Sequence, residues 1–127
     1  MRTMLFILAA TLFSGAAFAE DWLVLASSDK GVWEGRKGTR VFGTTKGGVP
    51  IAVADGRIRW TQDKSVDFVR WYVSVQDCKQ GYGKLVTLTM SGEFKYENDY
   101  VKNGGNIASA LGDMLCYDVE QQKLKGI

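Results

Sequence analysis

Residues 66–76 read VDFVRWYVSVQ, a stretch rich in β-branched and aromatic residues. Its apolar residues at every second position are Val69, Trp71, Val73 and Val75. Side chains two residues apart lie on the same face of a β-strand, so this spacing predicts one long strand. Phe68 and Tyr72 fall on the opposite face, and we expect that side of the strand to be partly covered as well.

The residues that follow predict a partner for this strand. Residues 79–83 contain two glycines and predict a turn, and residues 84–91 return as a second strand. Its apolar face carries Val86, Leu88 and Met90. The two strands are therefore expected to pair as an antiparallel hairpin. Residues 94–101 predict a shorter hairpin about the polar tripeptide Glu97-Asn98-Asp99.

Upstream, the strongest local signal is the dipeptide Asp55-Gly56. Both residues tolerate the positive φ angles of a type I′ turn, so residues 51–60 are predicted to form a tight hairpin. In the register of that hairpin, Arg57 and Arg59 share its outer face.

Two stretches near the start of the chain also predict strands. Residues 22–26 are apolar on both faces, which is typical of a central strand. Residues 39–44 form the second strand. Residues 27–38 between them are polar and turn-rich, and they predict a loop around Trp33.

The hydrophobic period changes after Gly104-Gly105, where Asn106 has the side chain of a helix N-cap. The apolar residues that follow at helical spacing are Ile107, Leu111, Met114 and Leu115. Cys116 falls nearly opposite Ile107 on an ideal helix. We therefore expect the helix to end or bend near Cys116, and the tail from about residue 120 to fray.

Strands followed by one helix are typical of a small α+β domain. We expect an antiparallel β-sheet of about five to seven strands, with one C-terminal helix packed on it. Residues 20–127 are long enough to form one domain with its own core.

Residues 1–19 have the pattern of a Sec-type signal peptide. Arg2 gives a positive start, residues 4–13 form an apolar run, and Ala17-Phe18-Ala19 is a small-x-small cleavage site. The run is too short to span a bilayer, and we expect no transmembrane segment. With no cysteine near the cleavage site, we expect no lipid anchor there. The mature chain is thus predicted to be periplasmic or secreted.

The chain has two cysteines, Cys78 and Cys116. In an exported chain an even cysteine count favours pairing, so we predict a disulfide between the end of the long strand and the helix. The alternative is a redox or metal pair. That alternative lacks a C-x-x-C spacing and has no histidine partner.

The chain contains no histidine, which removes the commonest general base and a common metal ligand. A pair of catalytic carboxylates would need to lie roughly 5–9.5 Å apart across a cleft. Nothing in the sequence marks such a pair among the acids on or near strands and turns, which are Asp67, Asp77, Glu93, Glu97 and Asp99. We therefore expect no enzymatic activity, no metal and no cofactor. The net charge of +2 predicts no nucleic-acid partner.

Residues 30–60 hold seven basic and two acidic residues, a local excess of positive charge. Guanidinium groups bind sulfate, phosphate and carboxylate through paired hydrogen bonds. The predicted ligand-binding residues are Arg36, Lys37, Arg40, Arg57 and Arg59. The alternative is a solvated surface, and the sequence leaves open whether the two groups of cations meet in space. The tryptophans and tyrosines are interpreted as core or edge residues.

Three segments carry a resemblance to a known family. They are Asp21-Trp22-Leu23-Val24, Val75-Gln76-Asp77-Cys78 and Leu115-Cys116. Together they resemble the surface-adhesin protein E family of Gram-negative bacteria, which are small exported domains with an antiparallel sheet, a packed helix and a late cysteine pair. The residues that transfer are Trp22, Asp77, Cys78 and Cys116. The family's founding adhesin is lipid-anchored and binds host matrix proteins, whereas this chain lacks the anchoring cysteine.

A second segment, Ser91-Gly92-Glu93-Phe94-Lys95-Tyr96, resembles the Ser-Gly…Lys-Tyr segment of periplasmic C-type lysozyme inhibitors, with a spacing one residue shorter. The main expectation is a non-enzymatic exported binding module of the adhesin E type. Its partner would be a protein or an anionic polymer in the envelope or outside the cell. The alternative is a periplasmic inhibitor of a lysozyme-type lytic enzyme.

Overall fold

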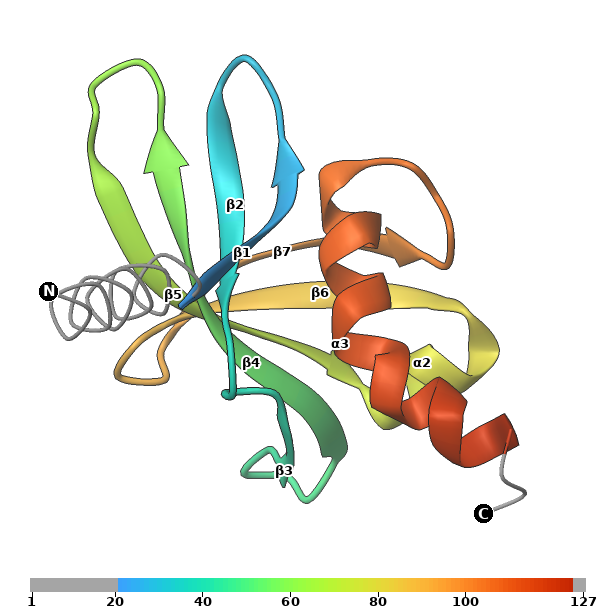
Figure 1. Ribbon diagram of the computed structural model, residues 1–127. Helices are drawn as coiled ribbons and strands as arrows, with labels where there is room; N and C mark the ends of the chain where they lie inside the picture. Colours follow the sequence, from blue (N-terminus) through green and yellow to red (C-terminus); the bar gives the residue numbers. More distant parts are fainter. Residues whose placement is uncertain (1–20, 125–127) are drawn as a thin grey trace, which may run out of the picture.

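The computed structural model describes residues 21–124 and shows the predicted α+β fold (Figure 1). The predicted signal peptide at residues 1–19 lies outside the described residues. The strands are β1 (Trp22–Ser27), β2 (Gly31–Arg36), β3 (Val41–Thr44), β4 (Pro50–Trp60), β5 (Val66–Ser74), β6 (Tyr82–Thr89) and β7 (Phe94–Val101). The helices are α2 (Val75–Gln80) and α3 (Ile107–Leu124). The expected antiparallel sheet and C-terminal helix are both confirmed.

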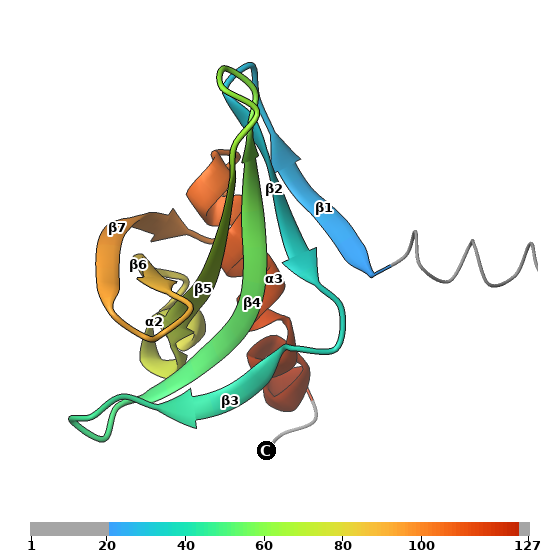
Figure 2. The ribbon, with the colours of Figure 1, turned by 90° about the vertical axis from the view of Figure 1, so that its left-hand side faces the viewer.

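The seven strands form one sheet in the order β1-β2-β4-β5-β6-β7, with β3 pairing to the remaining part of β4. Every pairing is antiparallel. Figure 2 shows α3 behind the sheet, with β4 in front, so the helix covers one face. We call that face the inner face and the opposite one the outer face.

The core lies between the inner face and α3. Its largest fully buried side chains include Trp71, Tyr100, Ile58, Leu85, Leu111 and Leu115. The predicted disulfide is confirmed: Cys78 in α2 is bonded to Cys116 in α3, with a Cα–Cα distance of 5.3 Å. It ties α3 to the end of the long strand, as the sequence predicted.

The predicted hairpin at Asp55-Gly56 is wrong, because both residues lie in the middle of the continuous strand β4. Gly56 pairs with Gly35 on one side and with Val69 on the other. A Cβ atom on Gly56 would lie 2.1 Å from Cζ3 of Trp71. The glycine is therefore required for close packing of the Trp71 ring against β4, and not for a turn.

Three other predictions on the strands need correction. The stretch around Trp33 is not a loop, since residues 31–36 form β2 between β1 and β4. The first strand lies at an edge of the sheet and not at its centre. Residues 94–101 do not turn back at Glu97-Asn98-Asp99, because they form the single strand β7. For residues 31–36 and 94–101, pairing along the whole segment outweighs the local turn preference.

The C-terminal helix α3 begins where it was predicted to begin but ends later than expected. Asn106 caps α3 as predicted, since its Oδ1 accepts a hydrogen bond from the Ser109 backbone N–H at 2.7 Å. The helix does not end or bend at Cys116, and it continues through residue 120 to Leu124. The side of α3 that carries Cys116 is covered by α2, a short helix that was not predicted. Beyond Cys116, Val119 is still buried.

Candidate functional site

Trp22 on the outer face joins the two predicted groups of cations. The Arg57 Cζ atom lies 4.1 Å from the centre of the Trp22 ring, and the Arg36 Cζ atom lies 5.8 Å from it. Phe68 of β5 is also near, with its ring centre 6.1 Å from that of Trp22. A guanidinium over an indole ring is attracted by the ring's negative face, so Trp22 holds both arginines at one place.

Glu34 of β2 holds Arg57 and Arg59 on the outer face. Arg57 Nε donates to Glu34 Oε1 at 2.6 Å, while Nε and Nη2 of Arg59 donate to the two carboxylate oxygens at 3.0 and 3.1 Å. Burial by itself raises the pKa of Glu34. The hydrogen bonds and charges of Arg59 and Arg57 outweigh that effect and hold the pKa below its usual value.

The other three predicted cations line one groove at the end of β1 and β2. Arg36, Lys37 and Arg40 form its polar side, and its apolar lining includes Leu23, Leu25 and Met114. The groove has a volume of about 320 Å³. Arg40 is also paired with Asp118 of α3, with Nε at 3.0 Å from Oδ2, and its Cζ lies 5.1 Å from the centre of the Tyr117 ring.

The structure therefore gathers the predicted binding residues into two groups: Arg57 and Arg59 on the outer face, and Lys37 and Arg40 in the groove between the inner face and α3. We call this set the basic surface: Arg36, Lys37, Arg40, Arg57 and Arg59. Arg36 belongs both to the groove and to the Trp22 stack, and so connects its two halves. Two carboxylates, Glu34 and Asp118, pair with three of the five cations, which leaves an excess of three positive charges.

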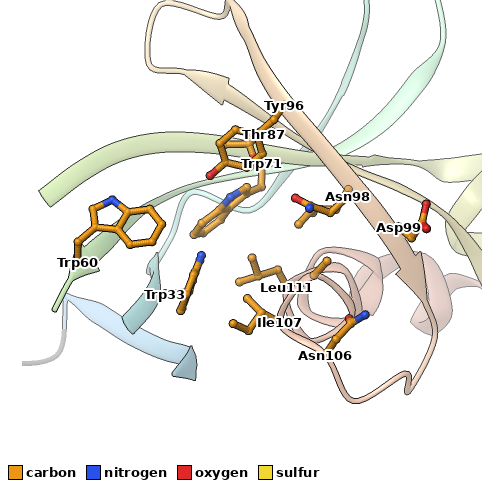
Figure 3. Close-up of a pocket in the computed structure, with 12 residues that line it drawn as sticks. Trp33, Trp60, Trp71, Thr87, Tyr96, Asn98, Asp99, Asn106, Ile107 and Leu111 are labelled. Atoms are coloured by element: carbon orange, nitrogen blue, oxygen red, sulfur yellow. The ribbon is translucent and has the colours of Figure 1, made fainter. Parts of the chain in front are cut away.

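A second region lies between the inner face and the start of α3. We call it the aromatic hollow; its volume is about 610 Å³. Its most prominent lining residues are Trp33, Trp60, Trp71, Tyr96, Asn98 and Asn106. Figure 3 shows Trp33 and Trp60 on one side of the hollow and Asn98 and Asn106 on the other. As the sequence indicated, Trp71 lies in the core and Trp33 and Trp60 pack against it, and the same rings line the hollow.

The aromatic side chains of the hollow are held firmly. The ring centres of Trp33 and Trp60 lie 5.8 Å apart at an interplanar angle of 75°, the edge-to-face arrangement that aromatic pairs favour. Trp60 Nε1 donates to Asp67 Oδ2 at 2.9 Å. Trp71 is only 1% exposed, and it packs against β4 at Gly56. The hollow is therefore formed by positioned rings.

Of the five acids considered in the sequence, three accept hydrogen bonds or form an ion pair, and two are exposed to solvent. Asp67 accepts from Trp60, Asp77 accepts from the Lys84 backbone N–H at 3.1 Å, and Asp99 pairs with the Lys84 ammonium. Glu93 and Glu97 are exposed. Within residues 21–124 there is no cluster of three or more histidine, cysteine or acidic residues that could hold a metal ion. The same range contains no helix long and apolar enough to cross a membrane.

Comparisons of the chain with protein-family models, with curated proteins and with solved structures found no match. The likeness to the surface-adhesin protein E family therefore rests on the residues quoted above.

Sequence reasoning missed the aromatic hollow and the anionic partner of the arginines. Glu34 lies in the stretch that was interpreted as a loop. The alternation of apolar Trp33 with charged Glu34, which is typical of a strand, was therefore not used as a strand signal. Asn98 holds an inner-face position on β7, opposite Leu85. Because the sequence analysis placed Asn98 in a polar turn, no signal in the sequence pointed to this inner-face position.

Proposed function

We propose that this chain is a non-enzymatic binding module of the adhesin E type that recognises anionic groups on a protein or polymer. The observation that carries the proposal is the position of Trp22 beside Arg36 and Arg57, which gathers these two cations and the neighbouring Arg59 on the outer face, while Arg36 also reaches the groove of Lys37 and Arg40. The proposal places this partner in the envelope or outside the cell.

The geometry supports recognition of a flat or branched anion. Glu34 fixes two guanidinium groups by charge-assisted hydrogen bonds and neutralises only one of their charges. Each arginine has five N–H donors, so donors remain beyond those used by Glu34. Exposed apolar side chains, including Val24 and Phe68, lie on strands next to these cations and offer contact area to a protein partner.

The first experiment uses heparin as a sulfated probe and measures its binding to residues 20–127, with the disulfide formed, over a range of NaCl concentrations. We expect binding that weakens steeply with salt, because cation–anion contacts release counterions. The double variant Arg36→Gln with Lys37→Gln should raise the dissociation constant at least about fivefold.

The matched control is Lys79→Gln with Lys95→Gln, which removes the same charge outside the basic surface. We expect this control to bind heparin nearly as well as the parent protein. Equal weakening in both double variants would show that net charge alone drives binding and would contradict the proposed surface. Salt-independent binding, or none to heparin or to an acidic protein, would contradict the function.

The turn between β6 and β7 favours a second candidate, the lysozyme inhibitor. Residues 89–93 form a tight exposed turn, in which the Thr89 N–H donates to the Glu93 carbonyl at 2.8 Å. Phe94 beside it is 63% exposed, whereas Tyr96 lines the aromatic hollow. This candidate predicts that the protein protects cell walls from a lysozyme, and that Lys95→Ala with Tyr96→Ala abolishes protection. Full protection by that variant would contradict it.

A further inference from the structure

The aromatic hollow has the size of a small-molecule site. Its volume of about 610 Å³ lies within the roughly 300–1,000 Å³ typical of such pockets. Its walls come from β2, β4, β5, β6, β7 and α3, so distant parts of the chain converge on it. One end of the hollow is formed by Asn98 of β7 and by Asn106, which directly precedes α3. The hollow therefore suits a compact ligand better than an extended chain.

Hydrogen-bond donors of the hollow remain available to a ligand. Trp60 Nε1 is used by Asp67, but Trp33 Nε1 and Trp71 Nε1 donate to no residue among 21–124. Trp71 is 1% exposed and belongs to the core, whereas Trp33 is half-buried, so the Trp33 ring is the one that a ligand can reach. Both residues line the hollow. A ligand there meets the Trp33 N–H as a rigid donor.

The opposite wall supplies further polar groups. Asn98 and Asn106 are exposed and line the hollow. The Asn106 Oδ1 atom caps α3, which leaves its Nδ2 group as a donor. Burial raises the pKa of the Tyr96 hydroxyl, with the charge of Asp67 adding to the effect, so Tyr96 is neutral at physiological pH.

The charges around the hollow exclude a simple anion. Asp99 lines the hollow, and its cation Lys84 is already paired with it at 2.5 Å. Asp67 lies behind Trp60 as its hydrogen-bond partner. A purely apolar ligand is also disfavoured, because it would strip water from the indole and amide groups without replacing their hydrogen bonds. The ligand that fits is neutral, with both apolar faces and hydroxyl oxygens.

We propose that the aromatic hollow is a binding site for a neutral saccharide of one or two rings. A pyranose ring has flat C–H faces that pack on Trp33 and Tyr96, and its peripheral hydroxyls accept from the Trp33 indole N–H and hydrogen-bond to the asparagine amides. The hollow shares no lining residue with the groove or with the Trp22 stack, so neither proposal depends on the other.

The test is an NMR titration of residues 20–127 labelled with ¹⁵N, using cellobiose, maltose and N,N′-diacetylchitobiose as probes. The four tryptophans give separate indole N–H signals, three from the hollow and one from Trp22 on the outer face. We expect at least one disaccharide to shift the Trp33 and Trp71 signals saturably and to leave the Trp22 signal in place. The response should not depend on NaCl.

Two variants locate the site. Asn98→Ala and Tyr96→Ala should each raise the dissociation constant at least about fivefold, while the spectrum elsewhere shows an intact fold. Glu97→Ala is the matched control on the same strand, since Glu97 faces away from the hollow, opposite Val86. Tyr96→Phe removes only the hydroxyl and should weaken binding less than Tyr96→Ala does.

Several outcomes would overturn the proposal. One is silence of the Trp33 and Trp71 signals with all three sugars up to their solubility limits. Another is sugar binding that Asn98→Ala and Tyr96→Ala leave unchanged. A proline-rich peptide that shifts these signals when the sugars do not would also overturn it, by assigning the hollow to a different ligand class.

Discussion

The inner and outer faces of the sheet are built from different residues. On β4 the inner face presents Ala52, Ala54 and Ile58, all buried under α3, whereas the outer face of the same strand presents Arg57 and Arg59. Apolar burial contributes about 25 cal/mol per Å², so the inner face supplies most of the folding free energy. Exposed ion pairs contribute little, which leaves the outer face free to serve contact with a ligand.

The inner face itself is not uniformly closed. Leu111, Leu115 and Val119 of α3 are buried against the sheet, but near the start of the helix the aromatic hollow separates the two. The buried middle of the inner face thus serves stability, whereas polar groups are open at the hollow, at the groove beside Met114 and Asp118, and on the outer face. Variants on the two faces are expected to lower stability by amounts that fall from the disulfide to Glu34.

The disulfide should give the largest loss when removed. Replacing both Cys78 and Cys116 with alanine releases a link across 38 residues, which the chain-entropy model values at about 4 kcal/mol of unfolding free energy. Urea denaturation of the double variant measures the loss. Reduction of the unmodified protein should give a similar value, and a loss below about 1 kcal/mol in both cases would contradict the role of this link.

A methyl group at Gly56 should give the second largest loss of unfolding free energy, because it disrupts packing on the inner face. In Gly56→Ala the Cβ atom would meet Cζ3 of Trp71 at 2.1 Å and the Glu34 carbonyl oxygen at 2.6 Å, so the ring or the strand must move. We expect a loss of about 3 kcal/mol in urea denaturation, or no folded protein. Gly43→Ala on β3 is the control, because its nearest neighbour would be Val53 at an ordinary 3.8 Å.

Gly56 also shows why part of the fold escaped prediction. The dipeptide Asp55-Gly56 has the local chemistry of a turn, but its strand pairs on both sides with distant strands. The prediction for the stretch around Trp33 was wrong for the same reason, since β2 also pairs on both sides, whereas residues 97–99 are held extended by pairing with β6 alone. By contrast, α3 was predicted because its cap at Asn106 and its apolar stripe are both local signals. The disulfide was predicted from cysteine count and compartment.

The short helix α2 carried a local signal that was not used. Ser74 accepts a hydrogen bond from the Asp77 backbone N–H at 3.0 Å, and Ser-x-x-Asp is a recognised start of a helix. The site was predictable in part. Arg57 and Arg59 share a face in any extended strand, so that conclusion survived the wrong hairpin. The aromatic hollow was not predictable, because it needs the order of five strands that pair over long distances.

Tyr100 tests a polar contact on the inner face. Its side chain is buried, and its hydroxyl donates to Asp113 Oδ1 at 3.1 Å, while the Asn103 backbone N–H also donates to Asp113. Tyr100→Phe should therefore lower the unfolding free energy by about 1 kcal/mol at pH 7. Tyr117→Phe is the control, because Tyr117 is exposed on the same helix as Asp113.

The pH dependence predicts the direction in which the stability difference between Tyr100→Phe and the parent protein changes. Burial and the charge of Asp113 raise the pKa of Tyr100 well above its usual value. A raised pKa means that the associated stability is complete below the unfolded value of about 10 and is lost as the pH rises past it. The deficit of Tyr100→Phe should therefore shrink above about pH 10. A deficit that stays constant from pH 7 to pH 11 would contradict this account.

Glu34 should show the smallest effect and marks the outer face. Glu34→Gln keeps the shape but removes the charge that Arg57 and Arg59 share, and because both arginines are partly exposed we expect a loss of about 1 kcal/mol or less at pH 7. The control is Glu97→Gln, an exposed acid with the same charge loss.

Since the arginine contacts lower the pKa of Glu34, the stability that they provide is present above the unfolded value of about 4.3 and is lost as the pH falls through the folded value. The gap between Glu34→Gln and the parent should therefore close in acid, whereas heparin binding at pH 7 should persist or strengthen because a competing carboxylate is gone. A gap that persists at low pH, together with loss of heparin binding, would mean that Glu34 is part of the binding surface itself and that the two faces are less separate than their residues indicate.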